Sequence, residues 1–571
     1  MANRDPRAEV EALVRAAQSG SLPRREVLKR AAAIGLGASS LAALVATYPR
    51  GEVVAALRRQ DVELAEEQVV RLPEGEPVRF DPGVTSGGKG LEMLQNLFEG
   101  LVGIDQRTGE LEMLLAETMT PNADATEFTF TVRDGLLWSD GTPLTARDFE
   151  YSWKRVLLPE TKSEYTTAMY PVAGAQAFVE GSGTIEDVAV RAVDDKTLTV
   201  GLSGPIPYFP LLAATWTYYP VPRHVVEEHG DAWVEAGTMV SNGPYMLTEW
   251  NHDQNMVLEQ NPNYWGQKPT ISRGEFTLLA DNVAQALVPF ENDELDQAQV
   301  SGADLDRAQA DDTLKELLQV FPRSGTRFVV CDVTNPPTDN PLVRQALSMA
   351  IDRATLADGV LKSEFTAADV VLPPDIPGYN PESGLGEDVA RAKELLAEAG
   401  FADGAGFPQL TLTYGAQDAV EKTSCEYLQG VWQQNLGIDV RLEAMEDKAF
   451  QDWFNARATE PFSLYISFWG SDWGDPANWH NQLFESSADF YHMHWVNERF
   501  DQLVNEARGM ADAAQRLALY EEAEAILNQD SPVIPLHNLN RIYVIKPYVK
   551  GIYHYPILGR TWLKYIQIEQ H

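Results

Sequence analysis

The sequence predicts an α/β protein built from two or three lobes, and three observations support this. The chain has 571 residues, which is more than one hydrophobic core usually serves. Residues Glu127 to Arg133 alternate apolar and polar side chains, the period-two pattern of a half-buried strand. Residues Gln409 to Glu443 read as strand, helix and strand in succession, which is the order of a βαβ unit. We therefore expect an antiparallel region and a separate α/β core.

The composition is that of a folded protein, and its charge excludes polyanionic partners. Hydrophobic residues make up 44% of the chain and charged residues 23%, which is ordinary for a globular protein. The 84 Asp and Glu residues outnumber the 45 Lys and Arg residues, and the formal net charge of -39 would repel nucleic acid phosphates. Cys331 and Cys425 lie far apart without metal or redox spacing, so we expect no metal site there and leave their pairing open.

Residues 1–66 are expected to be a targeting segment rather than part of the fold. Basic residues from Arg24 to Arg30 precede the apolar run Ala31 to Ala46, which is the order of a signal peptide. The string Pro23 to Lys29 resembles the twin-arginine (Tat) export signal. The run is shorter than the roughly 20 apolar residues that a spanning helix needs, which favours export. We expect an extracytoplasmic protein, in the periplasm or at the cell surface, with tethering by an uncleaved signal as the alternative.

Local patterns predict the secondary structure of the remaining chain. Thr145 followed by Asp148 is typical of a capping box at a helix start. The stretch Pro220 to Pro222 indicates a crossover between lobes. Helices are expected at 91–98, 146–157, 389–399 and 419–435 and from Pro341 onward, and strands at 68–81, 127–133, 197–202, 242–250, 256–260, 409–414 and 438–443.

The stretch Phe468 to Trp479 concentrates candidate binding residues. It holds three Trp, two Asp, two Gly and a Pro, and its Gly and Pro residues place Asp472 and Asp475 on an irregular loop. A carboxylate between Trp469 and Trp473 lies in partly apolar surroundings, where its charge is costly unless a cation meets it. We therefore interpret Asp472 as the partner of a ligand ammonium. The alternative is a structural turn with packed indoles.

Strings from about Glu66 to His571 resemble, in order, those of solute-binding protein family 5, the oligopeptide- and dipeptide-binding receptors of ATP-binding cassette importers. The strings include Phe98 to Leu101, Trp138 to Gly141, Asn242 to Tyr245, Asn261 to Trp265, Val343 to Leu347 and Pro532 to Leu536. The resemblance implies a bilobal periplasmic-binding-protein-like fold of type II with an extra subdomain. By the family's pattern, lobe I combines 67–97, 223–323 and 540–571, the extra subdomain is 98–222, and lobe II is 324–539.

The resemblance also implies a function and a set of binding residues. Receptors of this family bind peptides by the main chain, and the Asp of a Trp-x-x-Asp-Tyr motif meets the peptide ammonium. Residues Trp469 to Trp473 match this motif with Trp in place of Tyr, so the role falls to Asp472. Main-chain groups of Phe468 and Gly470 would flank the ligand, and Tyr165 matches a tyrosine that lines the family's cleft, with a packed surface tyrosine as the alternative.

The resemblance leaves the carboxyl end of a peptide without an obvious partner. Ile466 stands where oligopeptide receptors place a basic residue. Arg457 matches a second basic position and Lys362 lies close to a third, and for both the alternative is a solvated surface charge. Peptide length is therefore left open.

Three further functions are weighed against the peptide receptor. A receptor of the same fold for an oligosaccharide or another solute would use the indoles of Trp469, Trp473 and Trp479 as platforms. A hydrolase using Asp472 and Asp475 is less favoured, because no other group is present to activate water. A metal receptor using His480, His492 and His494 has little support. The favoured interpretation is a monomeric, non-enzymatic receptor without a cofactor that hands peptides to separate permease and ATPase subunits.

Overall fold

The computed structural model describes residues 63–78, 80–86, 89–280, 285–362, 364–557, 559 and 561–571. Most of the predicted targeting segment, residues 1–62, lies outside the described residues. Glu66–Ile568 form one compact unit with every named helix and strand. A second unit comprises Met1–Ala65 and Glu569–His571, and within it Leu64 forms an antiparallel bridge with Glu569. No helix among the described residues has the length and apolar character needed to cross a bilayer.

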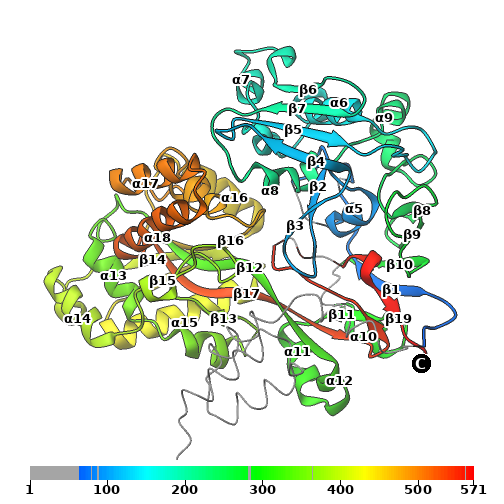
Figure 1. Ribbon diagram of the computed structural model, residues 1–571. Helices are drawn as coiled ribbons and strands as arrows, with labels where there is room; N and C mark the ends of the chain where they lie inside the picture. Colours follow the sequence, from blue (N-terminus) through cyan, green and yellow to red (C-terminus); the bar gives the residue numbers. More distant parts are fainter. Residues whose placement is uncertain are drawn as a thin grey trace, which may run out of the picture. The chain divides into compact units, whose positions relative to one another are not determined.

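A four-stranded sheet begins the compact unit (Figure 1). Its order is β1 (Val69–Glu74), β10 (Arg273–Leu278), β9 (Asn255–Gln260) and β8 (Tyr245–Asn251). β1 pairs in parallel with β10, and the other neighbours pair antiparallel. The strands expected at 242–250 and 256–260 are confirmed, whereas the first strand is shorter than the expected 68–81. It ends before Gly75 and Pro77, two residues that a continuing ladder disfavours.

A second four-stranded sheet is wholly antiparallel. Its order is β4 (Ala116–Pro121), β5 (Glu127–Val132), β7 (Thr197–Gly201) and β6 (Val190–Ala192). The alternation predicted for β5 is confirmed, because Phe128, Phe130 and Val132 are all buried. Helix α6 (Ala146–Leu157) begins with the predicted capping box, in which Thr145 accepts from the Arg147 N–H and the Thr145 N–H donates to Asp148.

A seven-stranded sheet forms the centre of the residues that follow. Its order is β11-β17-β12-β16-β14-β15, with β13 paired to β17. The strands are β11 (Gln297–Gln299), β12 (Leu318–Cys331), β13 (Thr366–Ala367), β14 (Leu410–Gly415), β15 (Val440–Met445), β16 (Leu464–Gly470) and β17 (Val533–Ile545). The predicted strand, helix and strand of the βαβ unit are β14, α15 (Ala419–Leu436) and β15, and the two strands pair in parallel.

The two long strands β12 and β17 lie side by side and run across both predicted borders between the lobes, at 323/324 and 539/540 (Figure 1). Their antiparallel register shifts where Arg323 pairs with Leu539 and Thr326 pairs with Asn538. The extra residues Ser324 and Gly325 form a β-bulge, which bends a strand locally. The division of the chain into lobes at these borders stays a prediction.

Helices cover this sheet and enclose its cores. α13 (Pro341–Met349), α14 (Val389–Glu398) and α15 share a core with Ile466, Cys331 and Cys425, and both cysteines are free, buried thiols. A second core gathers α17 (Glu498–Arg508) and α18 (Ala513–Asp530) around Trp479, with α16 (Asp447–Ala456) packed against it. The remaining helices and strands are α5 (Leu91–Leu97), α7 (Ala175–Val179), α8 (Phe209–Ala213), α9 (Arg223–His229), α10 (Leu287–Glu291), α11 (Gly302–Ala310), α12 (Asp312–Leu317), β2 (Val102–Ile104), β3 (Leu111–Met113), β18 (Val549–Lys550) and β19 (Gln567–Ile568).

Candidate functional site

Strand β16 has one edge that is only partly paired. On one side it pairs with β12 along its whole length, from Leu464 to Gly470. On the other side its ladder with β14 covers only Leu464 and Tyr465. From Ile466 to Gly470 the described structure therefore shows no neighbouring strand on this side. Such an edge can accept the main chain of an extended ligand.

The binding loop, residues 471–478, begins where this edge ends. The Ser471 N–H donates to the Ser324 carbonyl at the β-bulge of β12, with an N–O distance of 2.8 Å. The hydroxyls of the two serines lie 2.7 Å apart. A short 3-10 helix at Pro476–Asn478 closes the loop. The prediction that Asp472 and Asp475 lie on an irregular loop is confirmed.

Asn478 fixes the loop from within. It is fully buried, and its Oδ1 accepts from the Asp472 N–H at 2.9 Å and from Trp469 Nε1 at 3.4 Å. Its Nδ2 donates to Gln482 Oε1 at 2.9 Å. Asn478 lies in the stretch that the sequence singled out, but the sequence indicates no role for it. Its hydrogen bonds to Asp472 and Trp469 depend on how the loop folds, and no local sequence pattern predicts them.

The carboxylate of Asp472 meets the hydroxyl of Tyr165. Tyr165 Oη donates to Asp472 Oδ2 at 2.7 Å. Burial raises the pKa of Asp472 to about 6, although the hydrogen bonds from Tyr165 and Asn478 oppose this shift. The ion pairs of the described residues include none for Asp472. Asp472 is thus a carboxylate whose charge is costly until a cation reaches it.

Tyr165 is held as a neutral donor. Burial, reinforced by the charge of Asp472, raises the pKa of its phenol well above the ordinary value. Its ring stacks on Trp216, with centroids 5.9 Å apart and planes inclined by 22°. The indole of Trp216 is anchored in turn by a hydrogen bond to the Thr85 carbonyl at 2.9 Å. The structure therefore brings together two of the predicted site residues, Tyr165 and Asp472.

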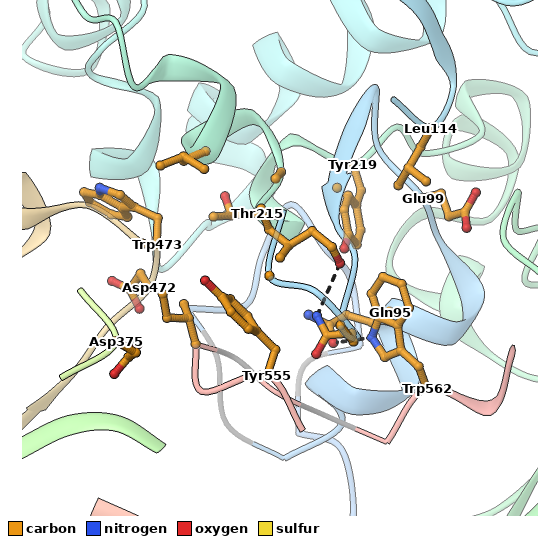
Figure 2. Close-up of a pocket in the computed structure, with 18 of the residues that line it drawn as sticks. Gln95, Glu99, Leu114, Thr215, Tyr219, Asp375, Asp472, Trp473, Tyr555 and Trp562 are labelled. Atoms are coloured by element: carbon orange, nitrogen blue, oxygen red, sulfur yellow. Dashed lines mark hydrogen bonds between the residues drawn. The ribbon is translucent and has the colours of Figure 1, made fainter. Parts of the chain in front are cut away.

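Two cavities open beside this pair. The anchor cavity, of about 290 Å³, is lined by Asp472, Trp473, Asp375 and Tyr555 among others (Figure 2). The tyrosine cavity, of about 410 Å³, is lined by Tyr165, Tyr170, Tyr208, Tyr218 and Arg508 among others. Trp473 lines both, and its Nε1 is buried without a hydrogen-bond partner. Each volume is within or close to the range of sites for small ligands.

Two more of the predicted residues, Phe468 and Trp469, lie on β16 at the open edge. Phe468 is 41% exposed, and its carbonyl accepts from the Tyr491 hydroxyl at 3.0 Å. Phe468 and Gly470 stand two residues apart, so their main-chain groups face the same edge of the strand. Trp469 is half-buried and packs edge-on against Phe490 with centroids 5.2 Å apart.

The structure brings neither Arg457 nor Lys362 to these cavities. Arg457 is buried at the end of α16, where it donates to the Pro461 carbonyl at 2.9 Å and pairs with Glu460 at 2.6 Å. Lys362 is exposed and pairs with Asp306. Neither residue lines the anchor cavity or the tyrosine cavity. Their assignment to a ligand carboxylate stays a prediction without support from this geometry.

Two arginines that the sequence interpretation missed lie beside the open edge. The guanidinium carbons of Arg323 and Arg327 lie 5.9 and 5.4 Å from the ring centroid of Phe468. Arg327 is buried and pairs with Asp418 and Glu421, each at 3.0 Å. Both arginines come from β12, and only the β12–β16 register places them here, so no local pattern could have indicated them.

Asp475 has a structural environment that differs from that of Asp472. Its two oxygens accept from both terminal nitrogens of buried Arg516, at 2.7 and 2.6 Å, and Oδ1 also caps the short helix by accepting from the Ala477 N–H at 2.9 Å. A carboxylate held in this way is not free to act as acid or base beside Asp472. The geometry gives no support to a hydrolase.

The sugar-binding and metal-binding interpretations also lose support from the geometry. Trp479 is fully buried, and its Nε1 donates to Ser471, so this indole is no sugar platform. His480 is buried against Glu524, whereas His494 lies 3.4 Å from Asp332 and His492 packs against Phe454. Among the described residues no group of three or more metal-ligating side chains gathers.

The chain is similar to known binding proteins along most of its length. The sequence model of the bacterial extracellular solute-binding proteins, family 5 Middle, matches residues 110–491. The oligopeptide-binding protein OppA of Bacillus subtilis is 32% identical over 488 residues, which cover 84% of this chain and 88% of that protein. The probable deoxycholate-binding periplasmic protein YgiS of Escherichia coli is 32% identical over 517 residues, which cover 89% of this chain and 95% of that protein.

Solved structures of binding proteins superpose on the chain. The murein tripeptide-binding protein MppA in its unliganded open form gives a TM-score of 0.76 at 29% identity, covering 89% of this chain and 99% of that one. Haemophilus influenzae OppA in complex with RPPGFSPFR gives a TM-score of 0.70 at 27% identity, covering 89% of this chain and 100% of that one. The predicted fold class, α/β and bilobal like the periplasmic binding proteins, is confirmed.

Proposed function

Because the chain belongs to family 5 of the bacterial extracellular solute-binding proteins, we propose that it captures peptides by their amino termini and delivers them to an ATP-binding cassette importer. Relatives with 31% or 32% identity are named oligopeptide-binding proteins, and structures of related receptors contain bound peptides. The family and its structural neighbours are binding proteins. The proposal therefore assigns no chemical step to this chain, and ATP hydrolysis falls to separate importer subunits.

One observation carries the proposal: the open edge of β16 leads directly to the carboxylate of Asp472. A peptide added as a strand beside Ile466 to Gly470 would place its first residue at the binding loop. Its ammonium would then meet a half-buried carboxylate that already accepts a hydrogen bond from Tyr165. A charge-assisted hydrogen bond of this kind is among the strongest that a binding site can make.

The same geometry supports broad tolerance for peptide side chains. Contacts to the main chain are common to all peptides, whereas side chains would extend into cavities such as the tyrosine cavity. Arg323, beside the open edge at Phe468, is our candidate partner for the peptide's carboxylate in place of the missing cation at Ile466. This position favours short peptides, because Arg323 Nη2 lies 3.4 Å from where a Cβ on Gly470 would stand.

Export and delivery complete the proposal. Related receptors are named periplasmic, which supports an extracytoplasmic location. The proposal of a Tat-type export signal rests on the string Pro23 to Lys29 alone. The permease and ATPase subunits of an importer would be its partners. Tethering to the membrane by an uncleaved signal is the alternative to release.

Calorimetry with matched peptides tests the proposal. We expect the wild type to bind a short peptide with a free amino terminus and to bind its N-acetylated form far more weakly. Asp472→Asn keeps the shape of the side chain but removes its charge, and should cost about 2 to 5 kcal/mol of binding free energy for the free peptide. The matched control Glu316→Gln removes an exposed carboxylate in α12 and should leave the affinity for both peptides unchanged.

Two results would contradict the proposal. The first is equal affinity for free and acetylated peptides, which would remove the ammonium from the interaction. The second is binding of an oligosaccharide or of deoxycholate with no binding of peptides, which would assign a different solute to the same fold.

A further inference from the structure

The anchor cavity is rich in carboxylates and aromatic rings. Asp472, Asp375 and Glu99 line it, together with the rings of Tyr219, Tyr555 and Trp473 (Figure 2). Its described lining residues include no Lys, Arg or His. Aromatic faces attract cations, and buried carboxylates require them. The walls are therefore suited to a positively charged group.

Glu99 is already satisfied and does not need a ligand. Its carboxylate pairs with Lys564 at 3.2 Å and accepts from the Tyr264 hydroxyl and from Trp265 Nε1, each at 2.8 Å. In Figure 2 it lies on the side of the cavity opposite Asp472 and Asp375.

Asp375 has no comparable partners. Its Oδ2 is buried and makes no hydrogen bond, and the ion pairs of the described chain include none for it. Burial raises the pKa of this carboxyl, and a hydrogen bond from Ser324 only partly opposes the shift. A second lining acceptor, Gln106 Oε1, is also buried without a partner. Unpaired buried acceptors of this kind are rare in folded proteins and call for an explanation.

The same structural junction holds the two unpaired carboxylates. Ser324, whose side chain acts against the burial-raised pKa of Asp375, lies 2.7 Å from the Ser471 hydroxyl, and Ser471 directly precedes Asp472. Tyr555 lines the same cavity, and burial, reinforced by the charge of Asp375, raises the pKa of its phenol. Figure 2 shows Asp375 and Asp472 on one side of the cavity, with the Tyr555 hydroxyl directed toward them.

We propose that the anchor cavity binds a second positive charge of the ligand, the Lys or Arg side chain of its first or second residue, with Asp375 as the partner. This inference rests on the proposed function, in which Asp472 takes the amino terminus. A cavity of about 290 Å³ has room for one long side chain beside that terminus. The cation would fill the space between the aromatic walls and pair with the carboxylate of Asp375.

Pairs of peptides that differ only in this charge test the inference. Lysyl-alanyl-alanine and alanyl-lysyl-alanine are each compared by calorimetry with the same peptide carrying norleucine, which has a similar shape and no charge. We expect one lysyl peptide to bind the wild type roughly tenfold to a hundredfold more tightly than its norleucine counterpart, as a charged hydrogen bond would give. The pair that shows the preference identifies the residue whose side chain enters the cavity.

The substitution Asp375→Asn then assigns the preference to this carboxylate. The ratio of lysyl to norleucyl affinity should fall to within about twofold of unity in Asp375→Asn and should persist in the control Glu316→Gln. Equal binding of lysyl and norleucyl peptides by the wild type, or a ratio that survives in Asp375→Asn, would overturn the inference and leave the proposed function intact. Failure of every peptide to bind the wild type would instead contradict the proposed function itself.

Discussion

At the scale of single residues, the site is organised by one carboxylate that lacks a cation. Asp472 is positioned by Asn478 and receives a hydrogen bond from Tyr165, yet burial still raises its pKa to about 6. The hydrogen bond from Tyr165 lowers the cost of the carboxylate's charge without removing it. A ligand ammonium would supply the missing interaction, so part of the binding energy would come from relief of a cost that the free protein carries.

The raised pKa of Asp472 predicts how peptide affinity depends on pH. A peptide ammonium needs the charged carboxylate, so protons and peptide compete, and affinity must fall as the pH drops through about 6. Between pH 7 and pH 5 the affinity of the wild type should fall by about tenfold, because the charged fraction of the free protein falls by that factor. Calorimetry across this range measures the effect.

The charge-free variant supplies the control for this profile. Asp472→Asn should bind weakly with little dependence on pH in the same range. A wild-type affinity that stays constant from pH 7 to pH 5 would show that Asp472 remains charged throughout and that burial does not set its pKa.

At the scale of secondary-structure elements, the site depends on how β16 and its loop are fastened to distant parts of the chain. The loop is attached to β12 through Ser324 and Ser471 and to α18 through Asp475 and Arg516. The Asp475–Arg516 pair is buried on both sides, and Arg516 also lies against the ring of Tyr520. This pair holds the base of the loop while Asp472 faces the cavity.

Breaking the pair between the loop and α18 should destabilise the protein. Arg516→Met keeps much of the side-chain volume but leaves Asp475 as a buried charge without its partner, at a cost of about 3 to 5 kcal/mol in the free energy of unfolding. Urea denaturation measures this loss. The exposed pair Arg499–Glu522 offers the control, because Arg499→Met should lower the free energy of unfolding by no more than about 1 kcal/mol. A loss for Arg516→Met no larger than that of the control would contradict the role assigned to the pair.

The elements also show what local sequence patterns can and cannot predict. The capping box of α6, the alternation of β5 and the βαβ order of β14, α15 and β15 are local, and the structure confirms them. The contacts from Asp475 to Arg516 and from Asp472 to Tyr165 join residues 41 and 307 positions apart. No periodicity records such pairs, so the sequence indicated Asp472 and, through the resemblance, Tyr165 as site residues, but not the contact between them.

At the scale of the whole molecule, family and charge point to the same kind of ligand. Membership of family 5 predicts two lobes that close over a solute, and the formal net charge of -39 would attract cationic peptides over a distance. Asp375 and Asp472, which line the anchor cavity, would continue this preference at close range. The proposal gives Arg323, beside Phe468, the role of the basic residue that is missing at Ile466.

The most direct test of the central claim is a crystal structure of the protein with a lysyl tripeptide. We predict that the peptide lies as an added strand along Ile466 to Gly470, with its amino nitrogen within about 3 Å of an Asp472 carboxylate oxygen. A peptide whose amino terminus lies elsewhere, with Asp472 still bonded only to Tyr165 and Asn478, would contradict the claim that this carboxylate anchors the ligand.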